Sequence, residues 1–199
     1  MSESRVPFTD EQQMLDVGAH VCAMQDGPER VLETLALAFG IGLNRGERCA
    51  YIAPEESTKT VREVLWAQGV DAEGAVSRGD LVFMTNREDL LKDGEEFDPD
   101  HLVEAIKGLF GQTIEAGYSG LRLSADVPWL TRNVPGGHRA MEFEEKADEI
   151  VNVKGVPLMA ICQYHLSDLD PEETLDIMER HPLTLIGGQV HTSEEYVAG

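Results

Sequence analysis

The chain has 199 residues, of which 42% are hydrophobic and 27% charged, so it is long enough to bury one sizeable core and has the composition of a globular protein. Its 37 acidic residues outnumber its 16 basic ones, and the formal net charge of −21 would repel nucleic acid and anionic lipid. We therefore expect one domain over residues 1–199 that contacts neither nucleic acid nor membrane directly, with residues 1–14 as a flexible or peripheral N-terminal segment.

The sequence also indicates in which cellular compartment the protein is expected. No apolar run approaches the roughly 18 residues that a membrane span needs, and "MSESRVPFTDEQQML" lacks the basic start and apolar segment of a signal peptide. Cys22, Cys49 and Cys162 lie far apart without a CxxC pair, which favours free thiols in a reducing compartment. We expect a cytoplasmic protein. Since only five of its sixteen cations are lysine, we also expect a halophilic origin.

Short apolar runs alternate with helical patterns along the whole chain, which predicts βαβ units. Several runs are apolar on both faces, as strands covered by helices on two sides should be. The fold class we predict is therefore α/β, with three layers and a mainly parallel sheet of about five or six strands. The predicted strands are 20–25, 48–53, 81–85, 121–127, 158–165 and 183–190.

Helix signals fall between these runs. Asp26 with Glu29 predicts a capped helix that carries an apolar stripe. Asp98 before Pro99 starts another, and Asp170 with Pro171 and Glu173 starts a third, which "RHP" at 180–182 ends. Residues 137–153 predict a helix whose acidic face, 142–149, we expect to be solvated.

The first βα turn carries no phosphate-binding motif. It reads "HVCAMQDGPERV", without GxxxxGK[ST] or GxGxxG, so ATP or dinucleotide binding in the usual mode is disfavoured. The chain also lacks the GxSxG elbow and the HExxH helix of common hydrolases. We expect no cofactor and no catalytic residue.

Two strands carry the candidate thiol site. His20 and Cys22 share one face of their predicted strand, and Cys162 and Tyr164 share one face of theirs. If the two strands are neighbours, one histidine and two thiols converge. A cysteine in an apolar strand is more often inert packing, and metal ligands are usually closer in sequence. Packing, ligand sensing, and metal binding or catalysis therefore stay open for the cysteines, and we predict no metal site.

A second group follows the strand at 121–127. Arg122 and Asp126 lie on one face of an apolar strand, so each needs a partner or a bound molecule, and an internal salt bridge is the simpler interpretation. Trp129, just after this strand, either borders an apolar pocket or closes the core. His181 before Pro182 is interpreted as a helix stop.

Six segments resemble, in order, a known family. They are "GAHVCAM" (18–24), "FGIGLNRGERCAYIAPEES" (39–57), "GYSGLRLSADVPWL" (117–130), "EFEEKADEI" (142–150), "AICQYHL" (160–166) and "RHPLTLIGGQV" (180–190). Together they resemble the MEDS domain, the methanogen and methylotroph sensory domain. The chain departs from the family pattern at Gln25 and around Tyr164, which leaves the ligand open.

The resemblance implies a RecA-like or similar fold that senses small hydrocarbon derivatives and acts through a DNA-binding or kinase module. The positions that it carries over are His20, Cys22, Arg122, Trp129, Glu144, Cys162, Tyr164 and His181.

Our leading interpretation is a stand-alone small-molecule sensor with its pocket at the carboxyl ends of the parallel strands. The expected ligand-binding residues are His20, Cys22, Arg122, Asp126, Trp129, Cys162 and Tyr164. We expect the signal to pass to a separate kinase or transcription factor, or through a homodimer. The alternatives are a thiol- or metal-dependent enzyme using Cys22, Cys162 and His20, a nucleotide-binding regulator without a Walker A motif, and a structural partner that binds through its acidic helix.

Overall fold

The computed structural model describes residues 18–25, 28–186, 189–193 and 196. The predicted N-terminal segment 1–14 and the predicted cap at Asp26 lie outside these residues. Among the described helices, none combines the length and the apolar character needed to cross a bilayer.

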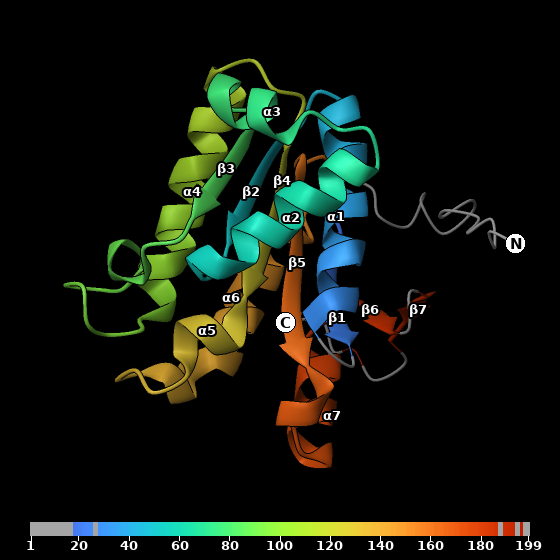
Figure 1. Ribbon diagram of the computed structural model, residues 1–199. Helices are drawn as coiled ribbons and strands as arrows, with labels where there is room; N and C mark the ends of the chain where they lie inside the picture. The colour runs from blue at the N-terminus through green and yellow to red at the C-terminus, as the bar shows by residue number, and fades with distance from the viewer. Residues whose placement is uncertain (1–17, 26–27, 187–188, 194–195, 197–199) are drawn as a thin grey trace, which may run out of the picture.

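One seven-stranded sheet forms the middle layer, in the order β3-β2-β4-β5-β1-β6-β7 (Figure 1). The first six strands are parallel and β7 runs antiparallel to β6. The strands are β1 (His20–Gln25), β2 (Arg48–Ile52), β3 (Leu81–Met84), β4 (Leu121–Asp126), β5 (Leu158–His165), β6 (Leu183–Ile186) and β7 (Gln189–Thr192).

The predicted α/β class and mainly parallel sheet are confirmed. β1 and β5 have the predicted bounds, and β2, β3 and β4 each end one residue before the predicted end. The single strand predicted at 183–190 is wrong, because β6 and β7 form an antiparallel pair. A signal was in the sequence, because two consecutive glycines, Gly187 and Gly188, between the short segments LTLI and QVHT are typical of a hairpin connection.

Helices cover both faces of the sheet (Figure 1). One face packs against α1 (Pro28–Asn44), α2 (Glu55–Ala67) and α3 (Ala72–Arg78), and the other mainly against α4 (Pro99–Glu115) and α6 (Ala140–Val151). The shorter helices are α5 (Val127–Thr131) and α7 (Pro171–Glu179), with 3₁₀ turns at Arg87–Leu90, Gly137–Arg139 and Leu166–Asp168.

The helix starts follow the predicted capping chemistry. Asp98 accepts a hydrogen bond from the His101 backbone at the start of α4. Asp170 and Glu173 form a reciprocal capping box at the start of α7, with Pro171 in its first turn. Both devices satisfy backbone N–H groups that the helix itself leaves without partners, which is why these short sequence patterns locate helix starts well.

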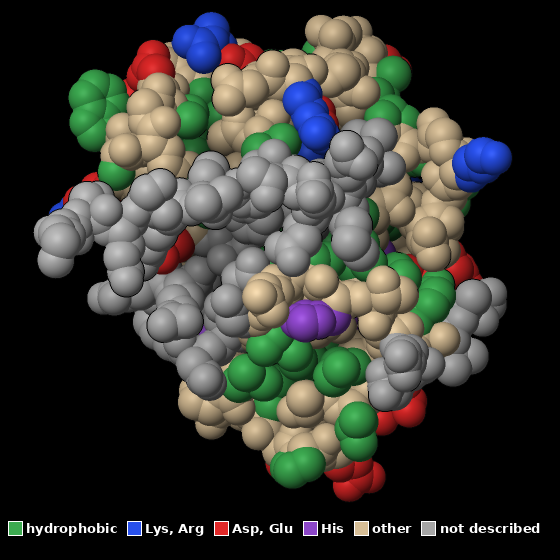
Figure 2. Space-filling model, turned by 90° about the vertical axis from the view of Figure 1, so that its right-hand side faces the viewer, with side chains coloured by type: hydrophobic (Ala, Val, Ile, Leu, Met, Phe, Trp, Pro, Cys, Tyr) green, Lys and Arg blue, Asp and Glu red, His purple; other side chains and the backbone are tan. Residues whose placement is uncertain are grey.

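The side of the molecule that carries β6 and β7 faces the viewer in Figure 2, where a group of hydrophobic side chains lies directly below a histidine on the surface. Ile186, at the end of β6, is the most exposed residue of that strand. The central strand β5 is more deeply buried than this edge of the sheet, since every one of its residues except His165 is buried.

Candidate functional site

β1 and β5 are adjacent parallel strands, and their register places Cys22 beside Cys162. Side chains alternate along a strand, so His20, Cys22, Cys162 and Tyr164 all point to the face covered by α6. The sequence predicted that one histidine and two thiols converge if the two strands are neighbours, and the structure shows that they are. All four side chains are buried.

α6 contributes two acidic side chains to the same place. Glu144 is fully buried and Asp148 is 8% exposed, so the expectation that the whole 142–149 face is solvated is wrong. Both lie one turn apart on the stripe that also contains Phe143, Ala147 and Val151, and that stripe packs on the sheet.

His181 completes the group. It follows α7, is fully buried, and its ring lies 4.2 Å from that of His20 between centroids. The interpretation of His181 as only a helix stop was therefore incomplete. The proline that follows ends the helix, while the histidine side chain turns into the core.

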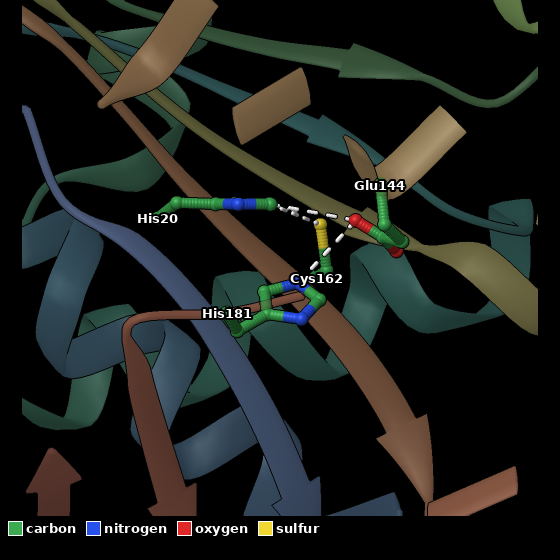
Figure 3. Close-up of side chains that lie close together, drawn as sticks. All are labelled: His20, Glu144, Cys162 and His181. Atoms are coloured by element: carbon green, nitrogen blue, oxygen red, sulfur yellow. Dashed lines mark hydrogen bonds and ion pairs between the residues drawn. The ribbon is translucent and has the colours of Figure 1, made fainter. Parts of the chain in front are cut away.

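One side-chain atom from each of four residues lies at the centre of this group, and the four residues come from separate segments of the chain (Figure 3). His20 Nε2 lies 3.6 Å from Cys162 Sγ and 3.4 Å from Glu144 Oε2. His181 Nε2 lies 3.3 Å from the same carboxylate oxygen. We call His20, Glu144, Cys162 and His181 the buried polar cluster.

A second set of contacts orients these side chains. His20 Nδ1 lies 3.2 Å from Asp148 Oδ1, and His181 Nδ1 lies 2.8 Å from the Ile177 carbonyl oxygen. The Tyr164 hydroxyl donates a hydrogen bond to Glu144 Oε1. His20, Glu144 and His181 are thus each held by a hydrogen bond on the side away from the cluster, and each directs its other polar atom toward the centre.

The charges in the cluster are coupled. Burial alone would lower the pKa of His20, but its hydrogen bonds to Asp148 and Glu144 raise it overall. Burial and the neighbouring His20 lower the pKa of His181. Burial would raise the pKa of Glu144, yet the two histidines hold it well below its usual range. A carboxylate between two imidazoles is the electrostatic centre of the site.

The thiols are not activated in this arrangement. Burial, followed by the negative charge of Glu144, raises the pKa of both Cys22 and Cys162 well above its ordinary value. A nucleophilic cysteine needs a lowered pKa. The arrangement therefore gives no support to the alternative of a thiol-dependent enzyme.

Arg122 and Asp126 are separated from the buried polar cluster by the sheet. Arg122 is beside Met159 and Cys49 in the strand register, and it points toward α1. It pairs with Glu47 at 2.8 Å, so the predicted internal salt bridge exists but its partner is Glu47 rather than Asp126. The seven predicted residues do not line one common pocket.

Asp126 and Trp129 belong to the carboxyl end of β4. Asp126 caps α5 by accepting a hydrogen bond from the Trp129 backbone. Burial raises the pKa of its carboxyl group. The Trp129 side chain is half-buried against the core that contains Cys162 and Tyr164. Trp129 thus packs at the border of the core.

A small apolar cavity of about 10 Å³ adjoins the buried polar cluster. It lies between α4, α6, β4 and β5, and Cys162 belongs both to its wall and to the cluster. Its other wall residues are Ile106, Leu123, Ala125, Phe143, Ala147, Ile150, Val151, Ala160 and Ile161.

Glu144, Asp148 and His181 were not predicted as site residues from their own sequence context, although the family resemblance pointed to Glu144 and His181. A direct signal was present for the two acids. Glu144, Ala147, Asp148 and Val151 follow the i, i+3, i+4, i+7 spacing of a buried helix face. Acidic residues at such core positions need partners, and these could have been sought among the histidines.

The comparison with protein families gives one match that spans most of the chain. The model of the MEDS family, described as the methanogen/methylotroph, DcmR sensory domain, matches residues 19–182. No curated protein sequence matches the chain.

Two solved structures share the fold. A KaiC-like protein from the hyperthermophilic archaeon Pyrococcus horikoshii OT3 is similar with a TM-score of 0.65 and 15% identity, over 100% of this chain and 90% of that one. The flagellar accessory protein FlaH from Methanocaldococcus jannaschii has a TM-score of 0.59 and 10% identity, over 95% of this chain and 82% of that one. At these identities the likeness concerns the fold alone.

Proposed function

Because the chain belongs to the MEDS family of sensory domains, we propose that it senses a small, mostly apolar molecule bearing one polar or soft group. The binding place is the core beneath α6, and the signal passes to a separate regulatory protein. One observation carries the proposal: Cys162 joins an apolar cavity to a buried group of charged side chains. Small-ligand sites combine apolar walls with a few placed polar groups in this way.

The two halves of the site suit the two ends of such a ligand. The aliphatic and phenyl side chains of α4, α6, β4 and β5 offer contacts to a hydrocarbon part. Cys162, the one residue shared by the cavity wall and the cluster, offers a soft polar contact to a halogen or thiol group. This location differs from the expected one at the carboxyl ends of the strands, because it lies under a helix in the middle of β5.

The size of the cavity suggests how binding would produce a signal. About 10 Å³ is close to the ~10–15 Å³ that one water molecule needs. A hydrocarbon derivative therefore requires a form in which α6 or α4 has moved outward, and its differential affinity for that form shifts the population.

α6 is well placed to report such a movement. Its inner side carries Glu144 and Ala147, whereas Glu145 and Glu149 are exposed on its outer side. Displacement of the helix would change this acidic outer surface. We propose that a regulatory protein with a complementary basic surface, or a second copy of the chain in a homodimer, detects the change.

A thermal-shift series with small halogenated, methylated and thiol-bearing compounds tests the proposal. A ligand at 100 times its Kd stabilises the folded protein by about 2.7 kcal/mol, which for a chain of this size raises Tm by roughly 5–10 °C. Ala147→Leu should abolish this shift, because it fills the cavity from the α6 side. Ala67→Leu, the same change at an exposed position of α2, should leave it unchanged.

The proposal is contradicted if no compound class raises Tm. It is equally contradicted if a compound that does so acts on Ala147→Leu as strongly as on the native chain, since its site would then lie elsewhere.

A further inference from the structure

The buried polar cluster has the donor set of a metal site. His20 and His181 offer imidazole nitrogens, Glu144 a carboxylate oxygen, and Cys162 a sulfur. All four donor atoms lie within 4.8 Å of one another, and all four residues are buried. Figure 3 shows the four side chains pointing toward a common centre from separate parts of the chain.

Three distances between donor atoms match those around a tetrahedral ion. With bonds of about 2.0–2.3 Å, neighbouring ligand atoms around zinc stand about 3.3–3.6 Å apart. The contacts of His20 with Cys162 and Glu144 measure 3.6 and 3.4 Å, and that of His181 with Glu144 measures 3.3 Å. Three edges of the group thus already have the lengths of a zinc tetrahedron.

The surrounding contacts orient the donors correctly for metal binding. The Nδ1 atom of His20 faces Asp148, and that of His181 faces the Ile177 carbonyl, so both present Nε2 to the centre. The outward hydrogen bond of a zinc-binding histidine to a carboxylate or carbonyl fixes its tautomer and ring orientation in the same way. Tyr164 likewise engages one oxygen of Glu144 and leaves the other directed inward.

Two of the inward atoms are otherwise unsatisfied. Glu144 Oε2 and His181 Nε2 are buried and make no hydrogen bond within the described part of the chain, although they lie only 3.3 Å apart. A buried carboxylate needs a compensating positive charge beside it. A proton on His181 would supply that charge to Glu144 alone, whereas a cation at the centre of the cluster would engage all four inward atoms.

We propose that His20, Glu144, Cys162 and His181 bind one divalent cation of the zinc type. Two nitrogens, one sulfur and one oxygen suit Zn²⁺ better than Mg²⁺ or Ca²⁺, which prefer six or more oxygens. The inference goes beyond the proposed sensory function and rests on the cluster alone. The wide separation of the ligands in sequence, from residue 20 to residue 181, explains why no compact metal motif announces the site.

Metal content and cobalt spectroscopy of the full chain test the proposal. Protein purified under reducing conditions should hold one zinc per chain. After chelation and addition of Co²⁺, it should show the visible bands of tetrahedral Co²⁺ and a sulfur-to-cobalt charge-transfer band. Cys162→Ser should remove the charge-transfer band and weaken binding at least tenfold, and Asp148→Asn should weaken it about 10- to 100-fold. Cys49→Ser is the matched control, because Cys49 is also a buried free thiol but lies among the residues that pack against α1 and α2.

Two results would overturn the site. One is a native chain that unfolds cooperatively yet holds no stoichiometric zinc and gives only the spectrum of hydrated Co²⁺. The other is loss of metal binding in Cys49→Ser equal to that in Cys162→Ser, with both variants folded by circular dichroism. Neither result depends on whether an organic ligand raises Tm, so failure of this proposal and failure of the sensory one are distinguishable.

Discussion

Arg122 is a fully buried cation, and the sequence correctly indicated that it needs a charged partner but pointed to Asp126 instead of Glu47. The charge is balanced by Glu47, which precedes β2 and accepts hydrogen bonds at 2.8 and 3.2 Å from Nε and Nη2. A bidentate pair of this kind satisfies both groups within the core. Arg122 therefore has a structural role on the face opposite the buried polar cluster.

We expect Arg122→Met and Glu47→Gln each to lower the free energy of unfolding by about 3–5 kcal/mol, because each leaves one partner charged or polar and unpaired in the core. The double variant should lose about 2–3 kcal/mol less than the sum of the two single losses. Urea unfolding of the four proteins measures this. Strictly additive losses would mean that the two groups do not stabilise each other.

Close contacts between atoms, as well as apolar stripes, set how near a helix lies to the sheet. α1 crosses the sheet at Gly42, where an added Cβ would lie 2.8 Å from Arg122 Nε and 2.9 Å from Cys49 Sγ. A side chain at this position would push α1 away from β2 and β4. Gly42 therefore sets the distance between the helix and the buried ion pair.

Gly42→Ala should destabilise the protein by about 1–3 kcal/mol, since overpacking outweighs the gain in helix propensity. Gly108→Ala in α4 is the matched control, because no atom lies within 4 Å of its added Cβ and the position is exposed. There the propensity gain stands alone, and we expect stabilisation of about 0.5–1 kcal/mol. Thermal or urea unfolding of both variants compares them, and equal effects would refute the close contact at Gly42.

Across the whole molecule, the dominant electrostatic fact is the net charge of −21. Most acidic side chains cannot find a cation, because acids outnumber bases by 37 to 16. Mutual repulsion then opposes the compact state, and dissolved salt reduces it.

We therefore expect Tm to rise by several degrees when KCl increases from about 0.1 M to about 2 M. Chloride is preferred to sulfate because sulfate stabilises proteins through exclusion from their surface. The effect should shrink near the isoelectric pH, where net repulsion vanishes. A Tm that is independent of KCl at neutral pH would contradict both this argument and the expected adaptation to high salt.

Residue patterns along the chain were enough to predict the α/β class, the bounds of most strands, the caps of α4 and α7, and which side chains share a face on β1 and on β5. These features depend on residues close together in the chain, through side-chain alternation and local backbone hydrogen bonds. The same patterns also showed that His20, Cys22, Cys162 and Tyr164 could converge, provided that their strands were neighbours.

That these strands are neighbours could be learned only from the folded chain. The same holds for the presence of Glu144 and His181 beside them and for the position of Arg122 and Asp126 on the other face of the sheet. The strand order inserts β1, the first strand, between β5 and β6, so side chains separated by more than a hundred residues meet. A carboxylate on an acidic helix resembles any solvated one until packing buries it. Burial, rather than residue type, turned Glu144 from a surface charge into the centre of the site.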